Sequence, residues 1–260
     1  MVGAARDGQR LRLVGRELEG SDGARFDGVP CDPREPGDRA RLVRHVLDEY
    51  GAPRAIVSNA GVGWQGWVRD MTGDDVERLF AVNVVAPVEL TRMLVPAMAA
   101  RPGGDVVLIA SVAAWVPVPP LTVYSATKAA LEAYGDGPRR EVWADGVRVH
   151  IIRPGPVATE FLARSIGRHP AEDEPGTRAA PGVPAGRVAD AVVHCLTSRR
   201  PRRRTIPRVL AAGQLARYQP LRPLVDLAAS RVSGRLVAFG RRWQWNGRRR
   251  RARRSERDPS

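Results

Sequence analysis

Lysine is almost absent from this chain of 260 residues. Lys128 is the single lysine among 42 basic residues, and the other 41 are arginines. A guanidinium cannot replace lysine where a site needs a compact ammonium whose pKa can be tuned. Lys128 is therefore the first candidate for a functional residue.

Cysteine and histidine are also scarce. Cys31 and Cys195 lie far apart and show neither metal-ligand spacing nor a disulfide framework, which predicts two reduced thiols in a cytosolic protein. The four histidines show no metal-ligand spacing either: His45, His150, His169 and His194. We therefore expect no metal site.

Long apolar runs are missing as well. No stretch approaches the ~18 apolar residues of a membrane span. The first ten residues are charged and contain no apolar run, so they do not resemble a secretory signal. With 43% hydrophobic residues the chain can form one sizeable domain, which we expect to be cytoplasmic.

The net charge of +14 is mostly local. Residues 241–260 hold nine arginines against Glu256 and Asp258, and residues 199–204 add five more arginines. The rest of the chain is nearly neutral. We predict a domain over residues 1–210, amphipathic helices over 211–240 and a disordered basic tail over 241–260.

Short apolar runs alternate with helical patterns along the body of the chain. The strands are predicted at residues 11–14, 55–58, 105–110, 147–152 and 205–210. The helices are predicted at residues 39–50, 74–98 (interrupted by Pro87), 124–143, 186–197, 209–218 and 221–238. This alternation predicts an α/β fold with a parallel sheet and helices on both faces.

Tyr124 and Lys128 are the residues whose spacing suggests chemistry. They lie four apart, on one face of a predicted helix. A nearby cation stabilises a phenolate and lowers a tyrosine pKa from its ordinary value of about 10. Ser111 follows a buried strand, where its hydroxyl can bond a substrate oxygen, and Asn83 lies within a long helix. The pair alone is a weak signal, but the ordered set is stronger.

The order of motifs resembles the short-chain dehydrogenase/reductase family from about residue 11 to Thr159, and more weakly to residue 210. The resemblance implies a Rossmann-like sheet, an NAD(P)-dependent oxidoreductase and a dimer or tetramer. It implies that Tyr124 is the general acid or base, and that Lys128 lowers its pKa and holds the nicotinamide ribose. In the same way Ser111 positions the substrate oxygen, and Asn83 supports a proton-relay water.

The resemblance also assigns cofactor contacts. Asn59, Ala60 and Gly61 match the motif beside the adenosine ribose, and Asp32 matches an aspartate near the adenine. The nicotinamide carboxamide is assigned to the segment that contains Pro154, Gly155, Val157 and Thr159. Arg16 is expected after the strand at 11–14, where arginine suits a 2′-phosphate, so the interpretation favours NADP with NAD as the alternative.

The chain departs from the family at its N-terminus. No strand with a glycine-rich turn is predicted before residue 11, and residues 1–10 resemble only the end of the first helix. The missing strand would lie between the strands at 11–14 and 55–58. Three explanations stay open: a misassigned start, a degenerate paralogue, or another chain that fills the gap.

Two functions are compared. The first is an oxidoreductase that acts on a small-molecule carbonyl or secondary alcohol, over which the loop at residues 160–184 closes. Either the segment with Trp115, Val116, Val118 and Leu121 lines an apolar substrate pocket, or its side chains simply pack in the core. The second is a catalytically impaired binding module whose arginine-rich tail contacts an anionic membrane surface, or less readily nucleic acid.

Overall fold

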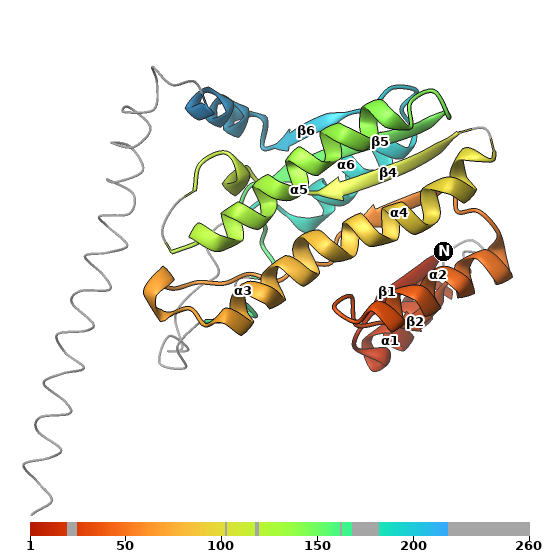
Figure 1. The fold of residues 1–260 in the computed structure, drawn as a ribbon, viewed down its shortest axis with the longest axis horizontal. Coiled ribbons are helices and arrows are strands. Elements are labelled where there is room, and N and C mark those ends of the chain that lie inside the picture. Colours follow the sequence, from red (N-terminus) through yellow and green to blue (C-terminus); the bar gives the residue numbers. More distant parts are fainter. Residues whose placement is uncertain (20–24, 102, 118–119, 162, 168–181, 218–260) are drawn as a thin grey trace, which may run out of the picture. The chain divides into compact units, whose positions relative to one another are not determined.

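The computed structural model describes residues 1–19, 25–101, 103–117, 120–161, 163–167 and 182–217, and its elements alternate between strand and helix (Figure 1). The strands are β1 (Val2–Ala5), β2 (Asp27–Pro30), β3 (Ala55–Ser58), β4 (Gly104–Ile109), β5 (Val147–Pro154) and β6 (Arg203–Ile206). The helices are α1 (Gly8–Glu19), α2 (Pro36–Tyr50), α3 (Gly73–Phe80), α4 (Ala86–Ala99), α5 (Thr122–Glu141) and α6 (Ala185–Leu196). Short helical turns are η1 (Val68–Asp70), η2 (Ala81–Val85), η3 (Val112–Ala114) and η5 (Arg208–Arg217).

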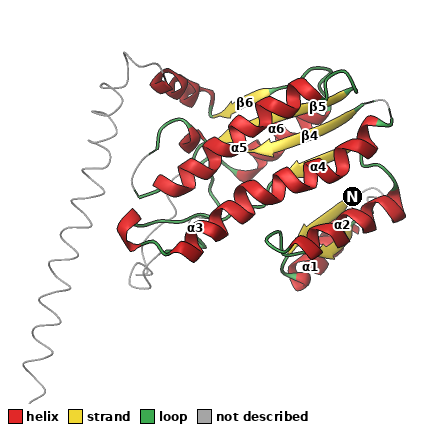
Figure 2. Ribbon diagram, viewed as in Figure 1, coloured by secondary structure: helices red, strands yellow, loops and turns green. Residues whose placement is uncertain are grey.

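All strand pairs are parallel. One sheet has the order β3-β4-β5-β6, and a second sheet pairs β1 with β2. Parallel strands need crossover connections, and helices supply them here, as Figure 2 shows. The predicted α/β class with a Rossmann-like parallel sheet is confirmed.

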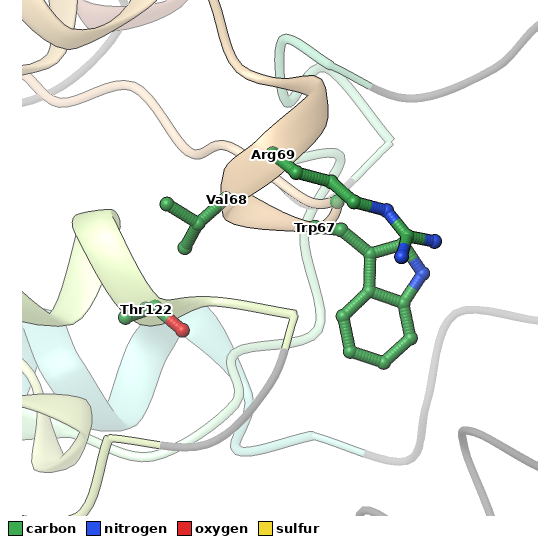
Figure 3. A pocket seen from close by; sticks show the side chains of 5 residues that line it. Trp67, Val68, Arg69 and Thr122 are labelled. Atoms are coloured by element: carbon green, nitrogen blue, oxygen red, sulfur yellow. The ribbon is translucent and has the colours of Figure 1, made fainter.

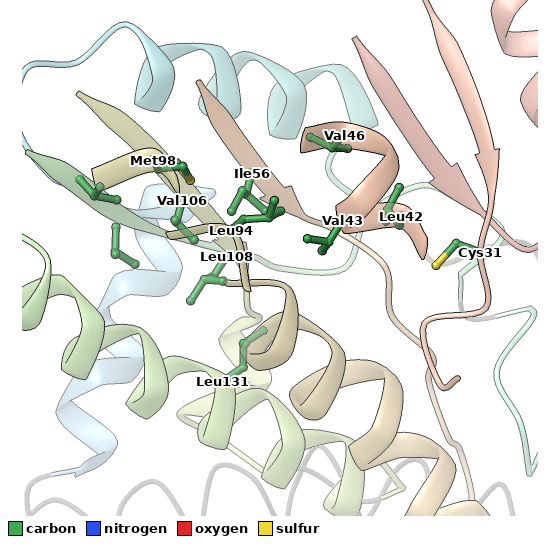
Figure 4. Packing of buried hydrophobic residues seen from close by; sticks show 12 residues of the cluster. Cys31, Leu42, Val43, Val46, Ile56, Leu94, Met98, Val106, Leu108 and Leu131 are labelled. Carbon is green, nitrogen blue, oxygen red and sulfur yellow. The ribbon is translucent and has the colours of Figure 1, made fainter. Parts of the chain in front are cut away.

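The core is organised by the alternation of side chains along β4. Val106 and Leu108 pack with α2, α4 and α5, whereas Val107 and Ile109 pack with α6 on the opposite face. Figure 4 shows the first cluster, to which Leu131 of α5 also belongs. A strand buried on both faces reads as a continuous apolar run, which is why residues 105–110 were predictable.

The two sheets share this core but do not join. Val2 and Val29 pack against the cluster that contains Ile56, yet no strand among the described residues pairs with both β1 and β3. Val57 of β3 is 42% exposed. The further strand that the resemblance leads us to expect would lie between β1 and β3.

The strand predicted at residues 11–14 is wrong. These residues lie in α1, whose first turn is capped by the Asp7 carboxylate, which accepts the backbone N–H groups of Gln9 and Arg10. Leu11 is buried against the glycines of β1 and β2. Four residues of which three are apolar cannot by themselves distinguish a strand from a helix. The first strand is β1, inside the segment that was interpreted as the end of a helix.

Smaller differences lie at strand ends. β5 continues through Pro154 instead of stopping at residue 152, because Pro154 pairs with Ile206 at the end of β6. β6 starts at Arg203, before the predicted 205, and η5 follows where residues 209–218 were predicted to be helical. The predicted helix at 221–238, the basic tail and residues 168–181 of the predicted loop lie outside the described residues.

The long helix is interrupted as predicted. A π turn, η2, stands between α3 and α4, and the Ala86 N–H bonds Ala81 O, five residues back. Pro87 has no N–H to offer the carbonyl of Asn83 four residues earlier, which explains the wider turn. By length and composition the run Gly73–Ala99 could cross a membrane, contrary to our expectation. Buried core helices pass the same test, so this evidence is weak.

A buried ionic cluster joins β4, β5 and the residue that precedes β6. Asp105 of β4 accepts two hydrogen bonds from the Arg148 guanidinium, each 2.8 Å, and lies 2.9 Å from His150 Nε2. His150 Nδ1 accepts the Arg202 N–H, so the ring proton is on Nε2 and points to Asp105. These hydrogen bonds hold the pKa of Asp105 below its ordinary value against the opposing effect of burial.

Asp105→Asn is expected to lower the free energy of unfolding by about 3 kcal/mol at pH 7, because it breaks a buried pair. The pKa of Asp105 is lowered in the folded state, so its contribution is present above pH ~4 and is lost as pH falls below that value. Urea titrations at pH 7 and pH 3.5 should therefore show a smaller difference at the lower pH. The exposed Asp48→Asn serves as control. Equal stability of Asp105→Asn and wild type at pH 7 would contradict this prediction.

Candidate active site

The polar residues singled out in the sequence collect at one edge of the larger sheet. Asn59, Ala60 and Gly61 follow β3, Ser111 follows β4, and Gly155 follows β5. The carboxyl ends of neighbouring parallel strands meet at the same edge, where α/β folds bind their ligands. The structure thus brings together segments that lie up to about a hundred residues apart in sequence.

Helix α5 carries Tyr124 and Lys128 into this edge, and both side chains are buried. Gly135 lets the helix approach the sheet, since a Cβ there would meet side chains of Leu108 and Ile151 at 2.9 Å. Lys128 Nζ donates to the carbonyl of Ile109 at 2.9 Å and lies 5.9 Å from the centroid of the Tyr124 ring. The helix therefore presents a phenol and an ammonium to the end of β4.

Burial controls the protonation of both groups. It raises the pKa of Tyr124 to about 12, an effect that a hydrogen bond with Ser111 partly opposes. Burial also lowers the pKa of Lys128 to about 8. At neutral pH the phenol keeps its proton and most of the lysine keeps its charge. The pKa of Tyr124 is thus raised and not lowered as expected, because desolvation outweighs the hydrogen bond with Ser111.

Asn83 connects the loop after β3 to α5. Its amide donates to Val62 O at 2.9 Å and to Thr127 Oγ1 at 3.0 Å, and its Oδ1 accepts the Val62 N–H at 2.9 Å. The Thr127 hydroxyl in turn donates to the Tyr124 carbonyl at 2.7 Å. The side chain of Asn83 is thus held by protein groups on both sides of the site, in the π turn η2.

Gly61 leaves room beside these groups. A Cβ at this position would lie 3.3 Å from Asn83 Oδ1 and 3.6 Å from Lys128 Nζ. A side chain would therefore crowd the Asn83 amide oxygen, whereas glycine leaves a small cradle between Asn83 and Lys128. This cradle lies where the resemblance expects a ribose.

The segment after β5 lies close to Tyr124. Gly155 N–H donates to Ile206 O at 2.7 Å, and Val157 forms a bridge with Val183. Thr159 Oγ1 accepts the backbone N–H of Phe161, whose ring centroid is 5.8 Å from that of Tyr124. This places the segment expected to hold the nicotinamide carboxamide beside the phenol.

The residue assigned to the cofactor 2′-phosphate must be corrected. Arg16 lies in the last turn of α1 and not after a strand. The residue after β1 is Arg6, whose charge helps to lower the pKa of Asp32 at the end of the neighbouring β2. Arg6 was missed because β1 was not recognised, although the run Val-Gly-Ala-Ala before an arginine was the available signal.

Asp32 and Arg6 share one edge of the small sheet. The Cys31 N–H bonds Ala5 O at 2.9 Å, so the ends of β1 and β2 are in register. The Asp32 carboxylate is held by Arg34, whose Nη2 donates at 2.7 Å. An aspartate and an arginine at this edge fit the adenosine end of a dinucleotide.

A cavity of about 250 Å³ opens near the start of α5 (Figure 3). It is lined by Gly66, Trp67, Val68, Arg69 and Thr122, and the Arg69 guanidinium lies 5.9 Å from the centroid of the Trp67 ring. These cavity residues were not predicted as functional from the sequence. Trp115, which it offered as a pocket wall or as packing, is a buried packing residue.

The described residues fit a nicotinamide dinucleotide at its two ends. Lys128, which the resemblance assigns to the nicotinamide ribose, lies next to Gly61, and Arg6 and Asp32 lie near each other where the adenosine end is expected. Between them, where a glycine-rich turn and a helix N-terminus would face the pyrophosphate, the described residues place no strand. The fit is therefore good at the reacting end and incomplete at the phosphates.

Comparison with known proteins identifies what the chain is similar to. The sequence model described as short chain dehydrogenase matches residues 1–168. Dehydrogenase/reductase SDR family member 4 of Bos taurus is 32% identical over 175 residues, which cover 67% of this chain and 62% of that protein. The chain spans 52%, 54% and 62% of the lengths of three of the curated relatives that match it.

Solved structures give the same result. A short-chain dehydrogenase from Streptomyces avermitilis is 25% identical and matches with a TM-score of 0.69, over 91% of this chain and 89% of that one. A metagenomic short-chain oxidoreductase in complex with NADP is 34% identical with a TM-score of 0.57, over 59% of this chain and 70% of that one.

Lys128→Met is expected to stabilise the protein by up to about 3 kcal/mol at pH 7, because burial lowers the lysine pKa from 10.5 to about 8. Between pH 8 and 10.5 the unfolded chain binds more protons, so wild-type stability rises with pH and the advantage of the variant shrinks. Urea titrations at pH 7 and pH 10 measure this difference. The exposed Arg140→Met on the same helix should show no such pH dependence. An advantage of equal size at both pH values would argue against a strained, buried ammonium.

Proposed function

Because this chain belongs to the short-chain dehydrogenase/reductase family, we propose that it reduces a small-molecule carbonyl compound with hydride from a nicotinamide cofactor. The observation that carries the proposal is a buried, protonated Tyr124 beside Ser111, with the ammonium of Lys128 behind its ring. A phenol with a pKa of about 12 holds its proton at neutral pH. It therefore carries the proton that reduction of a carbonyl requires, but its raised pKa makes it a weaker acid than an ordinary tyrosine.

In this mechanism the chain's own residues bind and protonate the carbonyl. Ser111 donates a hydrogen bond to the carbonyl oxygen and orients it toward Tyr124. Tyr124 transfers its proton to that oxygen as negative charge develops there, and the charged Lys128 stabilises the resulting phenolate. A bound nicotinamide supplies the hydride. The reverse reaction would use the same groups, with Tyr124 as the base.

We propose NADP as the cofactor, with NAD as the alternative. Arg6 supports this choice, because a guanidinium after the strand β1 suits a 2′-phosphate through paired, charge-assisted hydrogen bonds. The similar metagenomic oxidoreductase was solved with NADP. Lys128 and the space beside Gly61 would hold the nicotinamide ribose, and Val157 and Thr159 the carboxamide.

The proposal is tested by titrating the folded chain with NADPH in a calorimeter and by following NADPH oxidation at 340 nm with a panel of aldehydes and ketones. A parallel sample, extended upstream in its own reading frame, tests whether further residues complete the phosphate contacts. Binding and turnover by either sample support a reductase. A folded protein that neither binds NADPH nor reduces any carbonyl in either form would overturn the proposal.

Tyr124→Phe should lower kcat at least ~100-fold in the sample that turns over, because it removes the proton donor. The dissociation constant for NADPH should stay within about twofold, since the phenyl ring fills the same volume. Tyr134→Phe, a half-buried tyrosine of the same helix, is the matched control and should keep its activity. Normal turnover by Tyr124→Phe would exclude the assigned acid.

Arg6→Asp should weaken NADPH binding about tenfold or more relative to NADH, because it replaces a phosphate-binding cation by a repelling anion. Arg16→Asp makes the same charge change in the last turn of α1 and should leave the NADPH/NADH ratio unchanged. Competition titrations with both cofactors measure the ratio. An effect of Arg16→Asp as large as that of Arg6→Asp would indicate general electrostatics and not a specific contact.

A further inference from the structure

Three large polar or aromatic side chains meet beneath the candidate active site. Trp115, Glu132 and Arg153 are 5%, 2% and 1% exposed. One carboxylate oxygen of Glu132 accepts the indole N–H of Trp115 at 2.9 Å and Nη2 of Arg153 at 2.8 Å. The Arg153 guanidinium also stacks on the Trp115 ring, 4.7 Å from its centroid. Each member therefore contacts both others.

Each of these residues belongs to a different segment of the site. Trp115 ends the short helix η3, which Ser111 begins. Glu132 lies eight residues after Tyr124 in α5, which places both side chains on the same helical face. Arg153 comes immediately before Pro154, at the end of β5. The cluster thus joins the segments that supply the serine, the tyrosine and the carboxamide contacts.

The turn between Ser111 and Trp115 is short and fixed at both ends. Ser111 Oγ accepts the Ala113 N–H at 3.2 Å, and the Trp115 N–H bonds Val112 O at 3.0 Å. A displacement of the Trp115 indole would therefore also displace Ser111, because only the single helical turn η3 separates the two residues. The bond to Glu132 ties this turn to α5, the helix that carries Tyr124.

We propose that Glu132, Arg153 and Trp115 form a positioning clamp that holds the Ser111 hydroxyl at hydrogen-bonding distance from Tyr124. This inference rests on the proposed function, because the serine–tyrosine pair is what the clamp serves. The three residues touch neither substrate nor cofactor in this scheme; they act through Ser111 and Tyr124.

The chemistry of the clamp supports positioning over simple space filling. A buried ion pair must overcome the loss of hydration of both charges, and apolar side chains of similar volume would fill the same space without that cost. Hydrogen bonds and guanidinium–indole stacking add direction, which apolar contacts lack. Direction matters here because a serine and a tyrosine must converge on one carbonyl oxygen.

Trp115→Phe tests the clamp with the smallest change, since it removes the indole N–H and keeps an aromatic ring over Arg153. We expect kcat to fall about tenfold, with KM for the carbonyl within about twofold, because one bond to a buried charge is lost. Trp143→Phe, at an exposed tryptophan after α5, is the matched control. A kcat equal to that of the control would overturn the clamp.

A double-mutant cycle separates positioning from general stability. If the clamp acts through the serine, Trp115→Phe should cost almost nothing further in a Ser111→Ala background. Additive losses in the two variants would instead assign the effect to the fold as a whole and would overturn the proposal. Glu132→Leu with Arg153→Met, which removes both charges together, should fold and show the same loss of kcat. Full activity of that double variant would also overturn it.

A second readout does not need turnover. The amide of Ala113 reports the position of Ser111, because it donates to the serine Oγ. We expect its hydrogen exchange to be about tenfold faster in Trp115→Phe than in Trp143→Phe, with unchanged exchange in β4 and β5. If wild type shows no reductase activity, the proposed function fails, while this exchange still decides the clamp: equal rates in both variants would refute it.

Discussion

The burial of the Lys128 ammonium is the constraint on which the site depends. A charged group out of water loses hydration, and the lowering of its pKa to about 8 reflects this cost. Three features accommodate it: the Ile109 carbonyl at the end of β4, the space left by Gly61 and the close approach of α5 to the sheet at Gly135. Because the helix cannot move away from the sheet without losing these contacts, Tyr124 is fixed at the same edge.

The chain has an excess of positive charge, but the buried acidic groups are paired. The chain carries a formal charge of +14, yet its buried carboxylates are paired: Asp105 with Arg148, and Glu132 with Arg153. Both pairs involve β5 and connect it to a neighbouring element. The first lies near the start of β4 and the second near the active-site edge, so the strand is held by ionic contacts toward both of its ends. Such pairs contribute less to stability than to a specific arrangement, which a catalytic site requires.

The sequence predicted what depends on local pattern. Residues 55–58 are the strand that was expected, and Tyr124 and Lys128 share a helix face because of their spacing alone. The strand at 11–14 failed because four apolar-rich residues fit either period, and Arg16 was then assigned by position relative to a strand that is not there. Glu132 and Arg153 are 21 positions apart in the sequence, and no periodic pattern indicates which charged residues will pair over such a sequence separation.

The gap between β1 and β3 divides the site into parts that depend on different residues. Strands in the middle of a parallel sheet normally pair on both edges and are buried on both faces. Among the described residues, β1 pairs only with β2 and β3 pairs only with β4, so one edge of each is unpaired. Ser111 follows β4, and Tyr124 and Lys128 lie in α5, which contacts β4 and β5. The serine, tyrosine and lysine of the proposed acid–base chemistry thus all lie between residues 104 and 154. The affinity for the cofactor, by contrast, also depends on the groups that would contact its pyrophosphate, between the two sheets. For this reason, a variant can lose cofactor binding without losing the arrangement of the proposed catalytic groups, and the reverse also holds.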